Sequence, residues 1–354
     1  MADWSASMQR TYEYYVVDPH TWKDTKKLDN VKSCTITRDS ETETLGSATI
    51  DITESVGECY IRVYMVVIQN GVTERHPLGT FLVQTPSSSF DGKIRNVSMD
   101  AYTPLLELKE GKPPLGYSVL KGVNIMDLAS SLAYENARAP VVEARCDNNL
   151  YHDFVSDPND TWLTFLSDFI SNAKYTFALD EMGRILFSPK QDTASLQPVW
   201  TYTDDNSSIL YPNLTMDHDL YGIPNVVEVI YSKGGEHYYS RVVNDDPNSP
   251  ISTISRGREI LYRVTDPDMI GDPTKNQIEE YAKQLLRDLS SIEYTLSYTH
   301  GYCPVRLGDC VRLNYERAGI VNIKAKVISQ TIKCDPECPV TEKVVFTTKL
   351  WGGE

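Results

Sequence analysis

The stretch "WLTFLSDFISNAKYTFALDEMGRILFSP", residues 162–189, carries the strongest pattern in the chain. Its first half predicts a helix, because Leu163, Leu166 and Ile170 recur three and four positions apart and share one face, with three aromatic residues beside it. These apolar residues are Trp162, Leu163, Phe165, Leu166, Phe169 and Ile170. Asp157 or Asp160 could cap the start of this helix. We expect its three aromatic side chains to be core residues.

The second half of the same stretch predicts a tight β-hairpin. Two short apolar runs flank the sequence Asp-Glu-Met-Gly at 180–183. The glycine at 183 can take the positive φ that such a turn requires. A helix followed directly by a hairpin is a mixed α+β module, which could be either the wall of a ligand site or a structural element.

Strand patterns lie on both sides of this module. Residues 11–108 show period-two alternation and two hairpin turns, at Asn70-Gly71 and at Asp91-Gly92. A hairpin across Gly234-Gly235 and a run of strands over 292–351 follow later. The sequence therefore predicts a mainly β protein with an α+β insertion.

Two further helices are predicted. One covers "NIMDLASSLAYENA", with Asn124 as its N-cap and an apolar face containing Ile125 and Leu132. The other covers "DPTKNQIEEYAKQLLRDLS", with Asp272 or Thr274 as its cap. The Gly- and Pro-containing segment "KEGKPPLG" at 109–116 predicts a domain boundary.

Composition limits the possible functions. The chain has 354 residues, which predicts two or three domains, and its net charge is −15. An acidic surface repels the phosphate backbone, so specific nucleic-acid binding is not expected. Nothing resembles a signal peptide, and apolar runs such as "YMVVI" at 64–68 are too short for a membrane span. We expect a soluble protein made in a cytosol, with no membrane segment.

No motif for catalysis stands out. The nucleophile elbow, the phosphate-binding loop and the zincin helix are all absent from the sequence. His218 between two aspartates could bind a metal, although neighbours on a strand point to opposite faces. Residues 266–272 resemble a calcium loop only partly, because Ile270 stands where an oxygen ligand is needed. The paired carboxylates are those expected of an acidic surface.

Four of the seven cysteines are the sharpest candidates for a metal site. They are Cys303, Cys310, Cys334 and Cys338. Four thiolates could hold zinc or an iron–sulfur cluster, but the spacing is not the tight C-x-x-C of known ribbons. The alternative is that they are unrelated small apolar residues, as we expect for Cys34, Cys59 and Cys146. We expect no cofactor.

Several segments, taken in order, resemble a known family. The 162–189 stretch is similar to the middle module of phage tail baseplate hub proteins, which include the late control protein D group. "LGTFLVQTPSSSFDGKIRNVSMDAYTPLLEL" at 78–108 resembles the end of that family's first domain, and "IPNVVEVIYS" at 223–232 the start of its later β domain. "YAKQLLRDLSSIEYTLSY" with "PVRLGDCVRLNY" resembles its closing helix and strands. No single motif is diagnostic, and the likeness is collinear over most of the chain.

This resemblance implies a structural virion protein and not an enzyme. In such hubs two β-barrel or sandwich domains of each chain resemble a tail-tube subunit, so three chains join a sixfold tube to a threefold spike. The implied domains are a first tube-like domain at 1–110, a middle module at 111–206 and 240–291, and a second tube-like domain at 207–239 and 292–354. The implied localisation is the tail or baseplate of a virion assembled in the bacterial cytoplasm.

The resemblance also implies partners. They are two further copies of the chain, a tail tube or distal tube protein, a central spike or tail lysin protein, and baseplate wedge proteins. DNA, or ions, would pass through the acidic lumen without specific binding. Any cleavage of the cell wall is expected to come from a separate partner.

Two other functions stay open at this point. The many tyrosines, 22 against 8 phenylalanines, would also suit a receptor- or cell-wall-binding tail module. A tail-associated peptidoglycan hydrolase is the third possibility, although no nucleophile or metal motif favours it.

Overall fold

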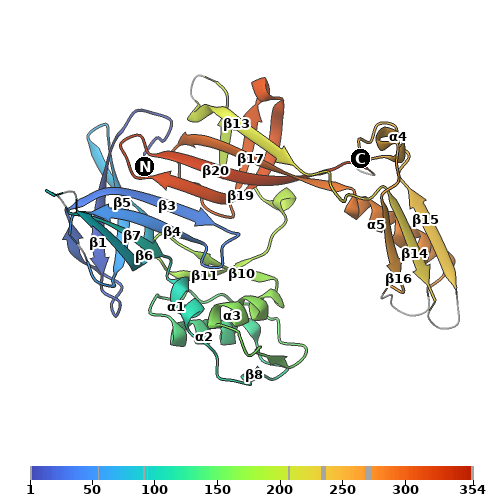
Figure 1. Cartoon of the computed structure of the whole chain (residues 1–354), viewed down its shortest axis with the longest axis horizontal. Helices are drawn as coiled ribbons and strands as arrows, with labels where there is room; N and C mark the ends of the chain where they lie inside the picture. The colour runs from blue at the N-terminus through green and yellow to red at the C-terminus, as the bar shows by residue number, and fades with distance from the viewer. Residues whose placement is uncertain are drawn as a thin grey trace. The chain divides into compact units, whose positions relative to one another are not determined.

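The computed structural model describes residues 2–54, 56–90, 92–93, 95–205, 208–232, 237–267 and 273–351. The chain forms two compact units (Figure 1). Unit 1 comprises Met1–Leu214 and Ser297–Val344, and unit 2 comprises Thr215–Leu296 and Val345–Glu354. Strands dominate the element order, which confirms the predicted mainly β fold with a helical insertion.

The first β region of unit 1 contains seven strands. They are β1 (Gln9–Val17), β2 (Asp24–Leu28), β3 (Val31–Asp39), β4 (Gly46–Ile52), β5 (Tyr60–Gln69), β6 (Val72–Phe90) and β7 (Arg95–Tyr102). β4 shows why these segments are strands, since its alternate residues are buried and its other residues are not. The β5–β6 turn lies at Asn70 and Gly71, which both have positive φ, as predicted. The Asp91-Gly92 turn lies partly outside the described residues.

The second β region continues the same sheet. Its strands are β12 (Trp200–Thr203), β13 (Leu210–His218), β17 (Ser291–Gly301), β18 (Cys310–Tyr315), β19 (Ile320–Lys333) and β20 (Pro339–Lys349). The main path is β13-β17-β20-β19-β3-β4-β7-β6-β5-β1-β2, with β18 and β12 branching from β19. The two β regions therefore meet at β3 and β19, which pair antiparallel from Ser329↔Asp39 to Lys333↔Thr35.

The helical module lies between these regions in sequence. It contains α1 (Leu105–Glu110), β8 (Ser118–Val119), α2 (Ile125–Asn136), β9 (Phe154–Val155), α3 (Trp162–Ser171), β10 (Tyr175–Leu179), β11 (Ile185–Pro189) and the short helix η1 (Thr193–Ser195). Figure 1 shows the three helices packed beside the β10–β11 hairpin. The apolar faces of α2 and α3 share one buried core with that hairpin.

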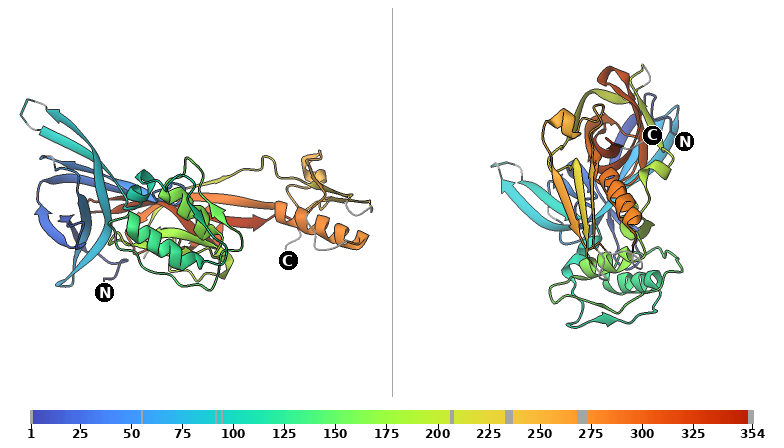
Figure 2. Two further views of the ribbon diagram at one scale, coloured as in Figure 1. Left: turned by 90° about the horizontal axis from the view of Figure 1, so that it is seen from below. Right: turned by 90° about the vertical axis from the view of Figure 1, so that its right-hand side faces the viewer.

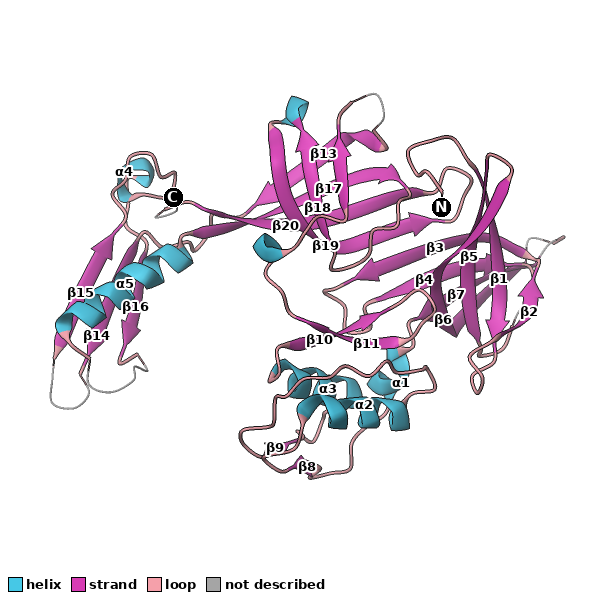
Figure 3. Ribbon diagram, turned by 180° about the vertical axis from the view of Figure 1, so that it is seen from behind, coloured by secondary structure: helices cyan, strands magenta, loops and turns pink. Residues whose placement is uncertain are grey.

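Unit 2 has a small core of its own. β14 (Val226–Tyr231), β15 (Tyr238–Val243) and β16 (Leu261–Thr265) form a three-stranded sheet, and α4 (Thr253–Arg256) lies between β15 and β16 in sequence. Figure 3 shows α5 (Lys275–Leu289) lying across this sheet. Ile278, Ala282 and Leu286 of α5 are buried against Val227 and Val229, as the predicted helical stripe requires.

Most predicted caps are confirmed. Asn124 accepts hydrogen bonds from the backbone N–H groups of the first turn of α2, and Thr274 forms a capping box with Gln277 on α5. Asp272 lies outside the described residues. The prediction of Asp157 or Asp160 as the cap of α3 is wrong, because Thr161 caps it through a capping box with Thr164.

The sequence did not predict α1 or the 19-residue length of β6. Figure 2 shows the β6–β7 hairpin extending beyond the rest of its sheet. The predicted Gly234-Gly235 turn lies outside the described residues, although the β14–β15 pairing on either side of it is present. The tube-like domain boundaries stay a prediction: β14 and β15 belong to unit 2, and residue 239 lies within β15.

The aromatic core of α3 gives a direct test of this packing. Phe165 is fully buried and stacks on Phe169, with ring centroids 6.0 Å apart. We expect Phe165→Ala to lower the free energy of unfolding by about 3–5 kcal/mol in a urea titration, because it leaves a cavity. Tyr134→Ala, at an exposed site on α2, should change it by less than about 0.5 kcal/mol. Equal losses from both variants would contradict the assignment of Phe165 to the core.

Candidate functional site

The turn of the β10–β11 hairpin, Asp180–Gly183, is the point where the helical module meets both β regions of unit 1. The hairpin register runs from Tyr175↔Pro189 to Leu179↔Ile185, which fixes where the turn projects. Gly183 has φ +75° and lies so close to Thr80 that an added Cβ would be 2.6 Å from the Thr80 Cβ. The glycine predicted from sequence is therefore required both by the turn and by its contact with β6.

The backbone of this turn is hydrogen-bonded to the first β region through Arg62. The Met182 carbonyl accepts hydrogen bonds from Arg62 Nη2 at 3.1 Å and from Trp22 Nε1 at 2.8 Å. Arg62 is only 1% exposed, and its remaining N–H groups donate to Thr80 Oγ1 at 2.9 Å and Asp24 Oδ1 at 2.7 Å. A buried guanidinium is tolerated only when paired in this way, so the turn and β5 depend on each other.

The Glu181 side chain makes ion pairs with both β regions. Its carboxylate is 12% exposed and lies 2.7 Å from Arg306 Nε and 3.8 Å from Arg38 Nη2. Arg306 follows β17, and Arg38 lies on β3 within the seam, where it is paired with Gln330 of β19. One carboxylate on the hairpin turn therefore makes ion pairs with residues of both β regions.

A buried polar network continues from Arg38 into the second β region. Arg38 Nη1 donates to Gln330 Oε1 at 3.1 Å, and Gln330 Nε2 donates to Glu342 Oε2 at 2.6 Å. Glu342 also accepts from Tyr298 at 2.6 Å and lies 3.6 Å from His300 Nε2. Both His300 and Glu342 are fully buried. Buried polar groups of this kind specify one arrangement of the core only when all are satisfied.

The charges within this network stabilise each other. Burial works against a charged imidazolium, but the hydrogen bond with Cys303 and the contacts with Glu342 raise the pKa of His300 to about 10. Burial likewise works against a charged Glu342, yet the hydrogen bond and charge of His300 keep the pKa of this carboxyl below its usual value. The pair is therefore ionic at neutral pH.

The Cys303, His300 and Glu342 side chains follow the order of a nucleophile, a base and an orienting acid. The Cys303 Sγ is 3.9 Å from His300 Nδ1, which is longer than the contact expected of an activated nucleophile. Cys303 is 2% exposed, so a substrate could not reach it without unfolding the core. This arrangement stabilises the fold and is not suited to catalysis.

The four candidate cysteines have different surroundings. Cys303 hydrogen-bonds with Tyr202 at 3.3 Å, and the Cys310 thiol lies against its neighbouring carbonyl. Cys334 lies beside Cys34, and Cys338 lies beside Tyr12. Among the described residues, no group of three or more His, Cys, Asp or Glu side chains could hold a metal ion.

The sequence also offered His218 and the 266–272 loop as metal-site candidates. The His218 ring lies 5.0 Å from that of Tyr294 in unit 2. Most of the 266–272 loop lies outside the described residues. Within the described residues, no helix is both long and apolar enough to span a membrane.

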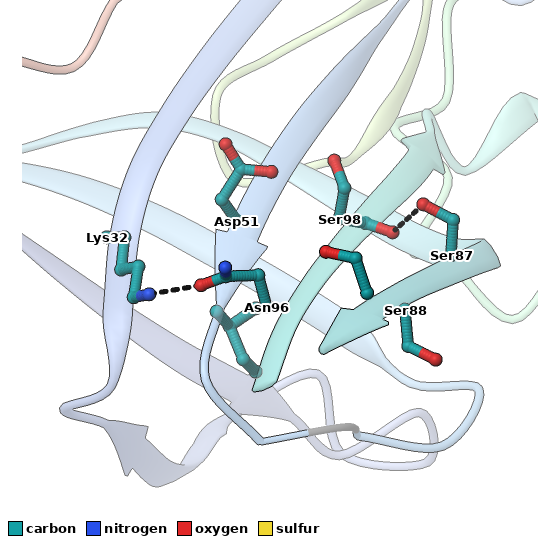
Figure 4. Close-up of a pocket in the computed structure, with 8 residues that line it drawn as sticks. Lys32, Asp51, Ser87, Ser88, Asn96 and Ser98 are labelled. Atoms are coloured by element: carbon teal, nitrogen blue, oxygen red, sulfur yellow. Dashed lines mark hydrogen bonds between the residues drawn. The ribbon is translucent and has the colours of Figure 1, made fainter. Parts of the chain in front are cut away.

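A hollow of about 390 Å³ lies near the turn end of the β6–β7 hairpin (Figure 4). Its lining residues are Lys32, Asp51, Ile52, Ser87, Ser88, Ser89, Asn96 and Ser98. Lys32 Nζ donates to Asn96 Oδ1 within the hollow. Small-molecule pockets are mostly apolar, and only Ile52 is apolar here. The hollow is therefore a poor candidate for a ligand site.

The fold has known counterparts. The chain is similar to the tail protein from Neisseria meningitidis MC58, with 14% identity, a TM-score of 0.62 and coverage of 95% of this chain and 96% of that chain. It is also similar to the 43 kDa tail protein of prophage MuSo2 from Shewanella oneidensis, with 12% identity, a TM-score of 0.60 and coverage of 94% and 97%. The chain has the fold of phage tail proteins. The resemblance drawn from the sequence is confirmed at this level.

A third counterpart is a chain of the lidded Francisella PdpA–VgrG complex, with 9% identity and a TM-score of 0.57. The alignment covers 96% of the present chain and 53% of that one. No protein-family model and no curated protein sequence matches the chain. At these identities the likeness is one of fold, and the collinear pattern of apolar positions and turns is what the sequence could reveal.

Removing the charge of Glu181 tests the contact at the hairpin turn. We expect Glu181→Gln to lower the free energy of unfolding by about 1–3 kcal/mol, since two guanidinium groups lose their carboxylate. The matched control is Glu43→Gln, which breaks the exposed Glu43–Lys109 pair at 2.8 Å and should cost less than about 0.5 kcal/mol. Urea titrations of both variants measure the difference, and a Glu181 effect no larger than the control would contradict this role.

The His300–Glu342 pair predicts a dependence on pH. A histidine in the unfolded chain loses its proton near pH 6.5, while His300 holds it to about pH 10 in the fold. Its contribution is fully present below pH 6.5 and is lost as the pH rises through 10. The free energy of unfolding should therefore fall by up to about 1.4 kcal/mol per pH unit within that window.

The variant His300→Gln should remove this part of the slope in urea titrations at pH 6.5, 8 and 9.5. His152→Gln is the control, because it makes the same substitution at an exposed site. A slope that persists in His300→Gln would show that His300 is not the charged group.

Proposed function

We propose that this chain is a structural protein of a phage-type tail, and that it acts as the hub between tail tube and spike. Three copies would form a ring. Each copy would contribute two tube-like β domains, so that six such domains meet the sixfold tube while the ring keeps threefold symmetry for the spike. The observation that carries this proposal is a fold shared with tail proteins over nearly the whole length of both chains.

The continuous sheet supports a ring. The β3–β19 pairing joins the two β regions side by side within one chain, as neighbouring subunits of a tube would be joined between chains. In the sheet order of the described residues, β2 and β13 are the end strands of the main path. Strand edges left open invite pairing with another chain, so these two strands are the surfaces proposed for contact between copies. Pro212 within β13 suits such an edge position.

The negative net charge of the chain supports a role in forming a conduit for DNA. One chain carries a net charge of −15, and three copies would triple it. A like-charged lumen lets DNA pass without binding, because the phosphate backbone is repelled. The proposed partners are the tail tube or distal tube protein, the central spike or tail lysin protein, and baseplate wedge proteins. The proposed localisation is the tail of a virion assembled in the host cytoplasm.

The hydrolase alternative has little support. The side chains that most resemble a catalytic pair are Cys303 and His300, and both are buried in the core of unit 1. The binding-module alternative rests only on the tyrosine content, which a subunit interface explains equally well.

The native mass tests the proposal. Mass photometry of the purified chain, alone and with the adjacent tail proteins, should detect a species of about 120 kDa, three times the 40.0 kDa of one chain. A chain that stays at 40 kDa with tube and spike proteins present would contradict the hub function, and binding to host cell walls would then favour the binding-module alternative.

A further inference from the structure

Two cysteines face each other across the seam between the β regions. Cys34 lies on β3, and Cys334 directly follows β19. The antiparallel register of these strands pairs Lys333 with Thr35, so the next pair in the same register is Cys334 with Cys34. The backbone agrees, because the Cys334 N–H donates to the Cys34 carbonyl at 2.9 Å.

The geometry of this pair suits a disulfide. Directly opposed residues in an antiparallel pair project from the same face of the sheet. Hydrogen-bonded pairs have Cα atoms about 5.5 Å apart, which is within the range of about 4.4–6.8 Å that disulfides span. Their Cβ atoms lie about 4.5–5.5 Å apart, so the two strands must draw slightly closer for the bond to form. The backbone register places the two cysteines directly opposite each other, and both are free thiols in this structure.

We propose that Cys34 and Cys334 form a redox-sensitive pair that can be oxidised to a disulfide joining the two β regions. The oxidant is a small-molecule disulfide. The Cys334 thiolate attacks one sulfur of the oxidant, which forms a mixed disulfide and releases one thiolate. The Cys34 thiolate then attacks Cys334 Sγ, which forms the Sγ–Sγ bond and releases the second thiolate. Two electrons pass to the oxidant, and the two released thiolates take up the two protons.

The surroundings decide the order and the speed of these steps. Cys334 is the more exposed of the two residues, whereas Cys34 is buried, so the oxidant should react with Cys334 first. The hydrogen bond with Cys34, together with burial, raises the pKa of the Cys334 thiol well above its usual value. Because the thiolate is the attacking species, the reaction should be slow at pH 7 and faster at pH 9.

A nearby third cysteine is the competing partner. Cys338 is fully buried, lies four residues after Cys334, and has its thiol pKa raised to about 11 by burial. Tyr12, which donates from its hydroxyl to the Asp335 carbonyl at 2.7 Å, lies against it. The cross-strand register favours Cys34 over Cys338, because Cys34 is directly opposite Cys334.

The position of the bond determines its effect. In the sheet order of the described residues, β3 and β19 are the strands through which the two β regions meet. A disulfide here would close a loop of about 300 residues and stop the seam from opening. A tail part leaves a reducing cytoplasm for an oxidising exterior, so the bond would form after assembly; this timing rests on the proposed tail function, whereas the chemistry does not.

Peptide mapping tests the pair directly. The purified full-length chain is incubated with oxidised glutathione at pH 7 and pH 9, alkylated and digested with trypsin without reduction. Trypsin releases residues 33–38 with Cys34 and residues 334–343 with both Cys334 and Cys338. We expect the two peptides to be linked, more rapidly at pH 9, and the link to persist in Cys338→Ser and in the distant control Cys59→Ser. It should be lost in Cys334→Ser.

The oxidised chain should also melt about 5–10 °C higher than the reduced chain, and Cys334→Ser should show no such shift. A disulfide within residues 334–343, or no linked peptide after oxidation at pH 9, would overturn the proposal. The native mass of the same sample reports the ring separately, so a failed disulfide and a failed hub function are told apart.

Discussion

The buried guanidinium of Arg62 is the constraint on which the arrangement of unit 1 depends. An unpaired cation at 1% exposure would be strongly destabilising, and its partners come from three separate segments: Asp24, Thr80 and the Met182 carbonyl. The last of these belongs to the β10–β11 hairpin, so the helical module must lie against β5 and β6. The neighbouring Glu181 extends the same requirement to Arg306 and Arg38, and through Gln330 to the core of the second β region.

This arrangement explains why a helix and a hairpin of only 28 residues can organise a much larger unit. The apolar face of α3 provides the burial that stabilises the module, while the polar turn of the hairpin sets its position. The β3–β19 pairing then makes one sheet from two β regions. In the proposed hub, the two tube-like domains would need a fixed spacing, and the turn and the seam would both contribute to it.

Local elements were predictable from the sequence because their signals are local. The apolar spacing over 162–171, Asn124 as a cap and Gly183 in its turn each follow from a few neighbouring residues. The cap of α3 was misassigned since Asp157, Asp160 and Thr161 are all good cap formers, and only the backbone decides between them. The helix α1 was missed because six residues hold too little of a periodic pattern.

Contacts distant in sequence were not predictable from one sequence. Nothing in Glu181 distinguishes a residue that pairs with two arginines from an ordinary exposed turn residue. Cys34 looked like an isolated small apolar residue, and its partner became visible only through the register of two strands about 300 residues apart. The four-cysteine hypothesis grouped thiols by sequence, whereas the fold places Cys334 with Cys34 and Cys303 with His300.

The most direct test of the account is the symmetry of the assembled particle. Electron microscopy of the chain bound to its tube and spike proteins would show where the two β regions of each copy lie. The account predicts three chains around one axis, with both β regions of every chain in the same ring of six domains. A particle in which only one β region of each chain surrounds the axis would contradict it.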